Sequence, residues 1–237
     1  MRILFIRHGR TASNVGHRLD TGFPGAELDE VGRAQAADLA VRLRDEPIDI
    51  VMTSDILRAR QTGEPLAKAL GVPVITHPGV REIYAGDWEM DTNWRDYFRV
   101  IQSWKTDPTA QIPNGENGVG FFRRFDEAIS ELEDDDYAAV VSHGGALRTW
   151  LAARGDLDLP DDVVLGNTDC VVVEGRPGAW RILSWAGIDC HSNGLSRHPA
   201  VGRISALTSC DSRTVPMAQG QCDTGTVLLS QNQDRTA

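Results

Sequence analysis

Two segments of the chain carry an imidazole beside groups that can hold a phosphate. The first is Arg7-His8-Gly9, followed by Asn14. A guanidinium binds two oxygens at once, and an imidazole can act as a nucleophile. Glycine lets the backbone turn sharply without a Cβ clash. The second segment, Val141-Ser142-His143-Gly144-Gly145, repeats the pattern of an apolar run that ends in His-Gly. Each pattern alone is also found on ordinary protein surfaces or around a core histidine.

Two further segments supply a cation and a carboxylate. Arg58 lies within the first turns of a predicted helix, where backbone N–H groups and the helix dipole favour an anion. Its alternative is an ion pair with Asp55. Glu82 has an apolar neighbour and two nearby aromatic residues, surroundings that favour a raised carboxyl pKa and a role as proton donor. Its alternative is an ordinary loop carboxylate paired with Arg81.

The elements that must position these side chains follow from the hydrophobic pattern. Short apolar runs alternate with longer helical patterns, which is typical of a largely parallel sheet covered by helices. We expect strands at 3–6, 48–52, 72–76 and 138–142, a hairpin at 169–174 and 180–185, and helices at 29–45, 55–70 with an interruption or kink at Pro65, 118–133 and from 144 onward. The predicted fold class is α/β: a three-layer sandwich with a mostly parallel central sheet flanked by helices. Its strand ends would bring His8 and His143 to one edge.

Two parts of the chain depart from this alternation. Residues from about 84 to 120 interleave aromatic residues with charges, prolines and glycines, which predicts a small helical and loop cap inserted in a domain of residues 1–186. The cap aromatics Tyr84, Trp88, Trp94 and Trp104 either line an apolar pocket or pack in the core. Residues 187–237 are polar and lack periodicity, which predicts a disordered tail.

Composition restricts the function classes. The 237 residues include 34 acidic and 24 basic ones, a net charge of -10 that repels nucleic acid and anionic membranes. The N-terminal apolar run is too short for a signal peptide, and no run is long enough to span a membrane. The four cysteines form no CxxC pair, which predicts free thiols rather than a zinc site. We expect a cytoplasmic protein with a small-molecule partner, no nucleic acid partner and no membrane partner.

Taken together, these segments resemble the histidine phosphatase superfamily, the phosphoglycerate-mutase-like proteins, from residue 1 to about 185. Six motifs stand in the order found in that family: Arg7-His8-Gly9-x-Thr11-x-x-Asn14, Leu28-x-x-x-Gly32-x-x-Gln35-Ala36, Ser54-x-x-Leu57-Arg58-Ala59-x-Gln61-Thr62, Glu82-x-x-x-Gly86-x-x-Glu89, Pro113-x-Gly115-Glu116 and Val141-Ser142-His143-Gly144.

The resemblance implies a reaction and a role for each residue. It implies that His8 attacks a phosphate monoester and becomes a phosphohistidine, which water then hydrolyses. The catalytic set would be His8, Glu82, Arg7, Arg58 and His143, with Glu82 as proton donor and acceptor. The phosphate would be bound by Arg7, Asn14, Arg58, His143 and the backbone of Gly144. The resemblance implies no metal and no cofactor.

Departures from the family pattern bear on the substrate. Asp20 lies where many members carry a Gln-Gly pair, and it would repel phosphate if it pointed inward; Asn117 replaces the usual Ser after Gly-Glu. Three functions remain open: a phosphomonoesterase acting on a small cytosolic ester, a mutase, and a noncatalytic phospho-ligand-binding module. The mutase is disfavoured because its longer insertions are missing, and the noncatalytic module because every reactive residue is present. The sequence leaves the ester and the oligomeric state open, a homodimer included.

Overall fold

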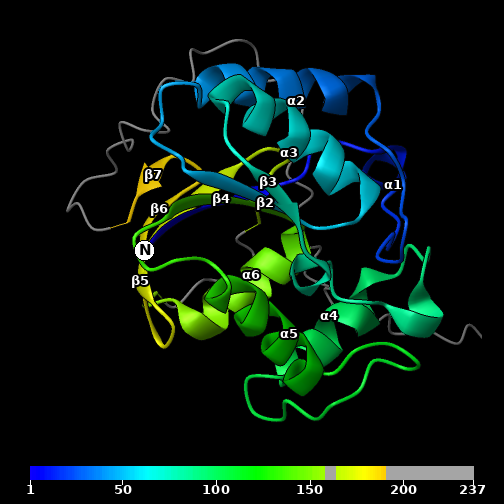
Figure 1. Cartoon of the computed structure of the whole chain (residues 1–237). Coiled ribbons are helices and arrows are strands. Elements are labelled where there is room, and N and C mark those ends of the chain that lie inside the picture. Colours follow the sequence, from blue (N-terminus) through cyan, green and yellow to red (C-terminus); the bar gives the residue numbers. More distant parts are fainter. Residues whose placement is uncertain (158–163, 191–237) are drawn as a thin grey trace, which may run out of the picture. The chain divides into compact units, whose positions relative to one another are not determined.

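The computed structural model describes residues 1–157 and 164–190. Seven strands form one sheet in the order β3-β2-β4-β1-β5-β6-β7 (Figure 1). Their bounds are Arg2–Arg7 (β1), Ile50–Thr53 (β2), Val74–Thr76 (β3), Tyr137–Ser142 (β4), Cys170–Arg176 (β5), Ala179–Trp185 (β6) and Ile188–Asp189 (β7). The pairs among β1 to β4 are parallel, and the pairs that add β5, β6 and β7 are antiparallel. The predicted hairpin is therefore confirmed.

Helices cover both faces of the sheet, as predicted for three layers. Helices α2 (Glu30–Arg42) and α3 (Leu57–Leu70) lie on one face, and α4 (Trp94–Ser103), α5 (Gly118–Ser130) and α6 (Gly144–Arg154) lie on the other (Figure 1). Alternate residues of β1 contribute to two separate cores: Ile3 and Phe5 pack on the α5 and α6 side, and Leu4 and Ile6 on the α2 and α3 side. A strand covered on both faces must be apolar throughout, which explains its unbroken hydrophobic run.

Polar side chains fix where the helices begin. The Asp29 carboxylate accepts from the Gly32 N–H at 2.7 Å and caps α2, and Asn117 accepts from the Gly120 N–H at 2.9 Å and caps α5. Helix α3 continues as one helix through Pro65 to Leu70, where an interruption or kink was predicted. Leu66 beside Pro65 is fully buried, so packing on the sheet holds this segment in place.

The insertion contains α4 and a short 3₁₀ turn, η2 (Gly86–Trp88). Trp104 is buried in the core, and Trp88 and Trp94 are partly buried against it. Only Tyr84 of the four cap aromatics is exposed, at 43%. Three of the four aromatic residues thus pack in the core instead of lining a pocket.

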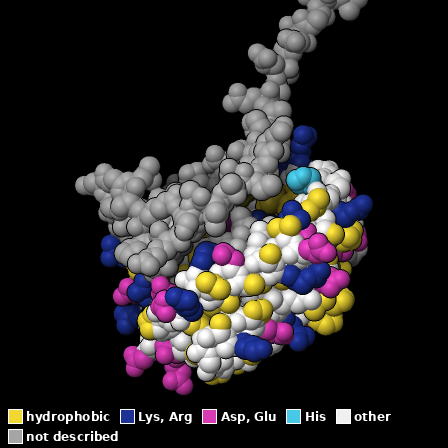
Figure 2. Space-filling view, turned by 90° about the horizontal axis from the view of Figure 1, so that it is seen from above, with side chains coloured by type: hydrophobic (Ala, Val, Ile, Leu, Met, Phe, Trp, Pro, Cys, Tyr) yellow, Lys and Arg dark blue, Asp and Glu magenta, His cyan; other side chains and the backbone are white. Residues whose placement is uncertain are grey.

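The C-terminal strands extend past the predicted domain boundary at 186, because β7 covers Ile188–Asp189. The remainder of the predicted disordered tail, with Cys210 and Cys222, lies outside the described residues. Within residues 1–157 and 164–190, no helix is both long and apolar enough to cross a bilayer. On the face that α2 and α3 cover, basic and acidic side chains are interspersed (Figure 2).

Candidate active site

Two neighbouring parallel strands bring the two imidazoles together. Strands β1 and β4 pair in register, with Arg7 opposite Ser142, so His8 and His143 follow at the same edge. The His8 N–H donates to the Ser142 carbonyl at 3.0 Å, and the ring centroids of the two histidines lie 5.2 Å apart. The repeated His-Gly exit therefore produces the adjacency that it predicted.

The hydrogen bonds of His8 define its tautomer. Its Nδ1 lies 2.7 Å from the Gly9 carbonyl oxygen, which can only accept, so Nδ1 carries the proton. Its Nε2 accepts from Arg58 Nε at 3.0 Å. Arg58 reaches this position because it lies in the first turn of α3, which follows β2. Strand β2 pairs with β4 on the side opposite to β1. The predicted alternative pairing with Asp55 is not formed, because Asp55 instead pairs with Arg81.

Burial and neighbouring cations keep both imidazoles neutral. Burial is the main cause that lowers the pKa of His8 well below 6.5, and the charges of Arg58 and Arg7 lower it further. The pKa of His143 is also well below 6.5, again through burial first and Arg58 second. A neutral His8 with an unprotonated Nε2 has the lone pair that a nucleophile needs.

Three buried nitrogens at this site have no hydrogen-bond partner in the described part of the chain. They are Arg7 Nε, Arg58 Nη1 and His143 Nδ1. Burial of an unpaired polar atom is costly and uncommon in native proteins. Because these atoms come from three different strand exits, the arrangement suits an anion that several donors would hold at once.

The carboxylate of Glu82 lies at the N-terminus of α6. It accepts from Gly145 N at 3.0 Å, from Ala146 N at 2.7 Å and from its neighbour Ile83 N at 2.9 Å. Of the neighbours that the sequence pointed to, Tyr84 lines the same cavity as Glu82, whereas Ile83 is buried in the core. The predicted alternative, a pair with Arg81, is not formed.

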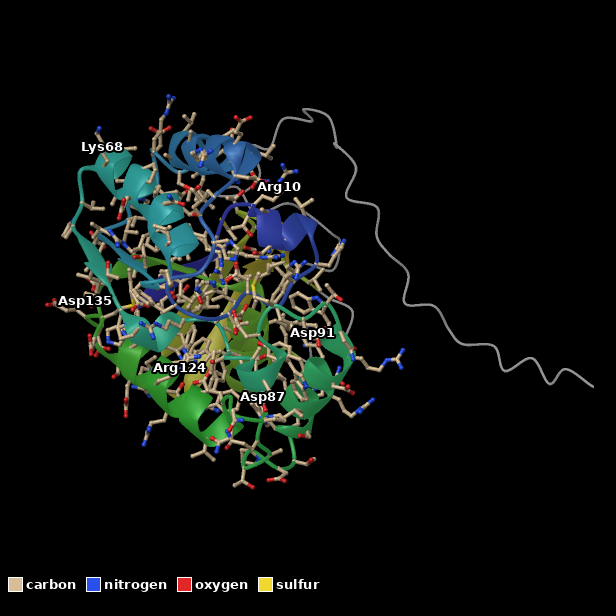
Figure 3. The ribbon with its side chains drawn as sticks, turned by 90° about the vertical axis from the view of Figure 1, so that its right-hand side faces the viewer. Arg10, Lys68, Asp87, Asp91, Arg124 and Asp135 are labelled. Atoms are coloured by element: carbon tan, nitrogen blue, oxygen red, sulfur yellow. The ribbon has the colours of Figure 1, made fainter. Side chains whose placement is uncertain are left out.

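Arg124 holds the segment that carries Glu82. This arginine of α5, labelled in Figure 3, donates to the carbonyls of Gly79, Arg81 and Glu82 at 2.6, 2.9 and 3.0 Å. It also forms two parallel bonds to Glu116, at 2.6 and 2.8 Å. Sequence reasoning missed Arg124, because no local pattern relates α5 to residues 79–82.

The remaining predicted residues border the site in different ways. Asn14 lies in the short helix α1 (Ala12–Val15), where its Oδ1 accepts from Thr11 N at 3.1 Å and from Asn167 Nδ2 at 3.3 Å. Asn167 Nδ2 also donates to the His8 carbonyl at 2.9 Å, and it too was missed. Gly144 packs against Arg7, since an added Cβ would lie 3.1 Å from Arg7 Nε. The structure thus brings Arg7, His8, Arg58, His143 and Gly144 together and gives Asn14 a second role as an anchor.

A loop covers this cluster. His8 is 3% exposed and His143 is fully buried. Asp20 points inward: its carbonyl accepts from Arg58 Nη2 at 2.7 Å, and its Oδ1 lies 3.5 Å from Arg58 Nη1. The Ala26 N–H donates to Asp20 Oδ2 at 3.1 Å. This bond links the two ends of residues 20–26, which we call the pocket loop. The departure noted at Asp20 therefore places a carboxylate beside Arg58, which the resemblance assigns to phosphate binding.

A cavity of about 1110 Å³ lies outside the pocket loop. Its wall includes Glu82 and the pocket loop but neither His8 nor His143. Its wall consists of Ser13, Asp20, Thr21, Gly22, Phe23, Pro24, Gly25, Ala26, His77, Pro78, Gly79, Arg81, Glu82, Tyr84, Glu89, Met90, Glu116, Arg124 and Glu127. Among the described residues, no group of three His, Cys, Asp or Glu side chains is placed to hold a metal ion.

Comparisons with known proteins agree with this geometry. A family model described as "Histidine phosphatase superfamily (branch 1)" matches residues 3–187. The chain is 36% identical over 160 residues to the adenosylcobalamin/alpha-ribazole phosphatase of Salmonella typhimurium, a match that covers 64% of this chain and 78% of the relative. It is 31% identical over 199 residues to a probable phosphoglycerate mutase GpmB of Yersinia pestis, covering 78% and 90%.

A solved mycobacterial glucosyl-3-phosphoglycerate phosphatase in complex with VO3 superposes with a TM-score of 0.65 and 30% identity, covering 78% of this chain and 98% of that one. The chain also spans 36% of the length of a larger relative, the PE-PGRS family protein PE_PGRS11 of Mycobacterium tuberculosis, with 29% identity over 215 residues.

Proposed function

The chain is an enzyme of the histidine phosphatase superfamily, and from that premise we propose that it is a metal-independent phosphomonoesterase that works through a phosphohistidine on His8. The observation that carries the proposal is the state of His8: a neutral ring with its proton fixed on Nδ1 and its Nε2 lone pair directed at Arg58. A phosphate bound between Arg58 and Arg7 would present its phosphorus to that nitrogen.

In the first step, His8 Nε2 forms a bond to phosphorus while the bond from phosphorus to the ester oxygen breaks. The electron pair of that bond stays on the leaving oxygen, which takes a proton from Glu82. Charge develops on the three equatorial oxygens, and Arg7, Arg58 and His143 would stabilise it. Gly144 would add its backbone N–H, and Asn14 would add its side-chain amide from the α1 side.

In the second step, water attacks the phosphohistidine. Glu82, now ionised, takes a proton from that water, and the bond between Nε2 and phosphorus breaks. The products are inorganic phosphate and a neutral His8, ready for another turnover. Two displacements in line with the bonds that break thus replace one direct attack by water.

In the structure, Arg58 donates to the Asp20 carbonyl and to His8 Nε2. We propose that incoming phosphate replaces these contacts on Arg58. The substrate would be a small phosphate ester in the cytoplasm, and neither nucleic acid nor a membrane surface would be a partner. A mutase is the second candidate, because one relative is named a probable phosphoglycerate mutase.

The test uses purified protein in EDTA with p-nitrophenyl phosphate, and separately with 3-phosphoglycerate plus a 2,3-bisphosphoglycerate primer. We expect release of inorganic phosphate from the first substrate, no net isomerisation of the second, and no turnover by His8→Ala. Acid quenching during turnover of a ³²P-labelled ester should trap label on the wild-type protein only. Isomerisation without phosphate release would favour the mutase, and full activity of His8→Ala would exclude the proposed nucleophile.

A further inference from the structure

The walls of the cavity outside the pocket loop point to the class of ester that the enzyme accepts. We propose that it selects phosphate esters whose leaving group is flat and apolar and carries no negative charge. This proposal rests on the proposed function of the same site. It concerns the leaving group of the ester, which the proposed phosphate-binding residues do not select.

The two arginines and the histidine of the cavity wall already have partners within the protein. Arg81 pairs through Nε and Nη2 with the Asp55 carboxylate. Arg124 has donors bound to Glu116 and to three backbone carbonyls. His77 contacts Glu131 through Nε2 at 3.2 Å and accepts from Gly79 N at 2.9 Å. A second anionic group on the substrate would have to break one of these arrangements to gain a partner.

Carboxylates outnumber the cations in the same wall. Five carboxylate side chains line the cavity against two guanidinium groups. Among the described residues, the Glu127 side chain on α5 forms no hydrogen bond or ion pair. Another, Glu89, accepts from the backbone N–H groups of Thr21 at 2.9 Å and Gly22 at 3.0 Å in the pocket loop. A leaving group with its own carboxylate would therefore be repelled.

Apolar side chains of the same wall remain uncovered. Phe23 is 65% exposed, and Tyr84 and Met90 are each 43% exposed, although most other aromatic side chains of the domain pack in the core. The Arg81 guanidinium lies over the Phe23 ring at 5.1 Å and holds it in place. A flat apolar leaving group would cover these side chains when the ester is bound.

The first experiment compares three esters with the same ring: phenyl phosphate, 4-carboxyphenyl phosphate and 4-(aminomethyl)phenyl phosphate. We expect kcat/KM for the carboxylated ester to be about tenfold or more below that of phenyl phosphate, and the deficit to shrink as salt is added. The aminomethyl ester should equal or exceed phenyl phosphate. The carboxylate does not make the phenolate a worse leaving group, so the expected deficit reports binding. Equal kcat/KM for all three esters would overturn the proposal.

Two variants localise the effect. Glu127→Lys should raise kcat/KM for the carboxylated ester relative to phenyl phosphate by about threefold or more, whereas Glu133→Lys, an exposed residue outside the wall, should leave that ratio unchanged. Phe23→Ala should lower kcat/KM for phenyl phosphate more than for glycerol phosphate. An unchanged ratio in Glu127→Lys, or an equal loss with both esters in Phe23→Ala, would contradict the assignment of the wall.

Binding to His8→Ala separates this proposal from the proposed function. Calorimetry with this variant should give the same order of dissociation constants for the three ring esters, even if no ester is turned over by the wild type. If none of the esters is hydrolysed but their dissociation constants follow the expected order, the phosphatase proposal is refuted and the selectivity is supported. If the esters are hydrolysed without discrimination among them, the phosphatase proposal is supported and the selectivity is refuted.

Discussion

At the level of single residues, the hydrogen bonds of His8 give its ring the state that the proposed nucleophile requires. The Gly9 carbonyl holds the proton on Nδ1, and Arg58 marks the direction in which Nε2 presents its lone pair. The same guanidinium lowers the pKa of His8 and, in the proposed function, binds the phosphate. In the proposed function, Arg58 thus both keeps His8 neutral and binds the negatively charged phosphate.

In the proposed function, Asp20 would compete with phosphate for Arg58, which leads to a first prediction. Both side chains are nearly buried, at 8% and 3% exposure. Removing the carboxylate in Asp20→Asn leaves the Arg58 charge less compensated, so we expect a lower Tm without ligand and a larger rise of Tm on addition of inorganic phosphate. The KM for p-nitrophenyl phosphate should fall about three- to tenfold. Asp45→Asn, at an exposed surface residue, is the control. A higher KM in Asp20→Asn would show that Asp20 assists binding.

Glu82 gives a second prediction at this scale. The isosteric Glu82→Gln keeps an oxygen that can accept from the start of α6 but removes the transferable proton. We expect kcat for glycerol phosphate, whose leaving group is poor, to fall about 10²- to 10⁴-fold. The loss with p-nitrophenyl phosphate should be much smaller, because p-nitrophenolate leaves without protonation. Equal losses with both substrates would assign Glu82 a role other than proton transfer.

Among the elements, the first turn of α6 joins the two halves of the site. Gly144 and Gly145 let this turn approach Arg7 on one side and Glu82 on the other. Several family motifs also turn out to fasten elements to one another. Gln35 of α2 accepts from Arg10 N at 2.8 Å, and Gln61 of α3 accepts from Leu28 N at 2.7 Å. These glutamines hold the loops around His8 and do not touch the cluster of imidazoles.

A glycine-to-alanine substitution at the start of α6 should lower activity without lowering stability. A Cβ at Gly145 would lie 2.9 Å from Glu82 Oε1, so Gly145→Ala must displace the carboxylate. Alanine has a better helix propensity than glycine by about 1 kcal/mol, and the displaced atom ends a flexible side chain. We expect thermal unfolding to be unchanged or slightly raised while kcat for glycerol phosphate falls at least tenfold. In Gly120→Ala on α5, where the nearest atom is 3.4 Å from the added Cβ, activity should stay at the wild-type level.

The contact of α5 with the Glu82 segment can be tested with a matched pair of arginines. Arg124 and Arg154 both form two-pronged bonds to carboxylates, Glu116 and Asp126 respectively, but only Arg124 also binds the carbonyls of residues 79–82. Lysine cannot reproduce the planar fork. We expect Arg124→Lys to lower kcat for glycerol phosphate about tenfold or more, with a smaller effect on p-nitrophenyl phosphate, and Arg154→Lys to alter neither. Equal effects of the two substitutions would mean that Arg124 acts only through stability.

For the whole molecule, the buried histidines link folding to pH. The pKa of His8 and that of His143 lie well below 6.5 in the native state, whereas both return to about 6.5 in the unfolded chain. Below pH 6.5 the unfolded chain therefore binds more protons than the native protein. The free energy of unfolding must fall as pH drops from 6.5 toward the native pKa values, by up to about 1.4 kcal/mol per pH unit for each histidine.

Urea unfolding at about pH 7.5 and about pH 5.5 measures this loss. The matched variant is His143→Gln, which keeps a side chain able to hydrogen-bond Ser54 but does not titrate. We expect the wild type to lose more stability than the variant between the two pH values. Losses of the same size would show that the pKa of His143 does not differ between the native and the unfolded protein.

The sequence alone determined which side chains meet. Apolar runs covered on both faces define β1 and β4, and the carboxyl ends of neighbouring parallel strands must lie at one edge, so His8 and His143 meet whatever the loops between them do. Arg58 follows from the same rule applied to β2. The sequence also placed Glu82 close to this edge, although its contacts with the backbone of Gly145 and Ala146 appear only in the structure.

Only the tertiary structure decided how these groups are supported and what lies beyond them. The contacts of Arg124 with residues 79–82, of Asn167 with His8, and of Asp20 with Arg58 join positions far apart in the chain. Local pattern cannot specify such contacts, because they depend on the packing of α5 and on the path of the pocket loop. The charges of the cavity wall also depend on packing. The composition gives the numbers of arginines and carboxylates, but only the packed structure decides which of them form ion pairs with each other.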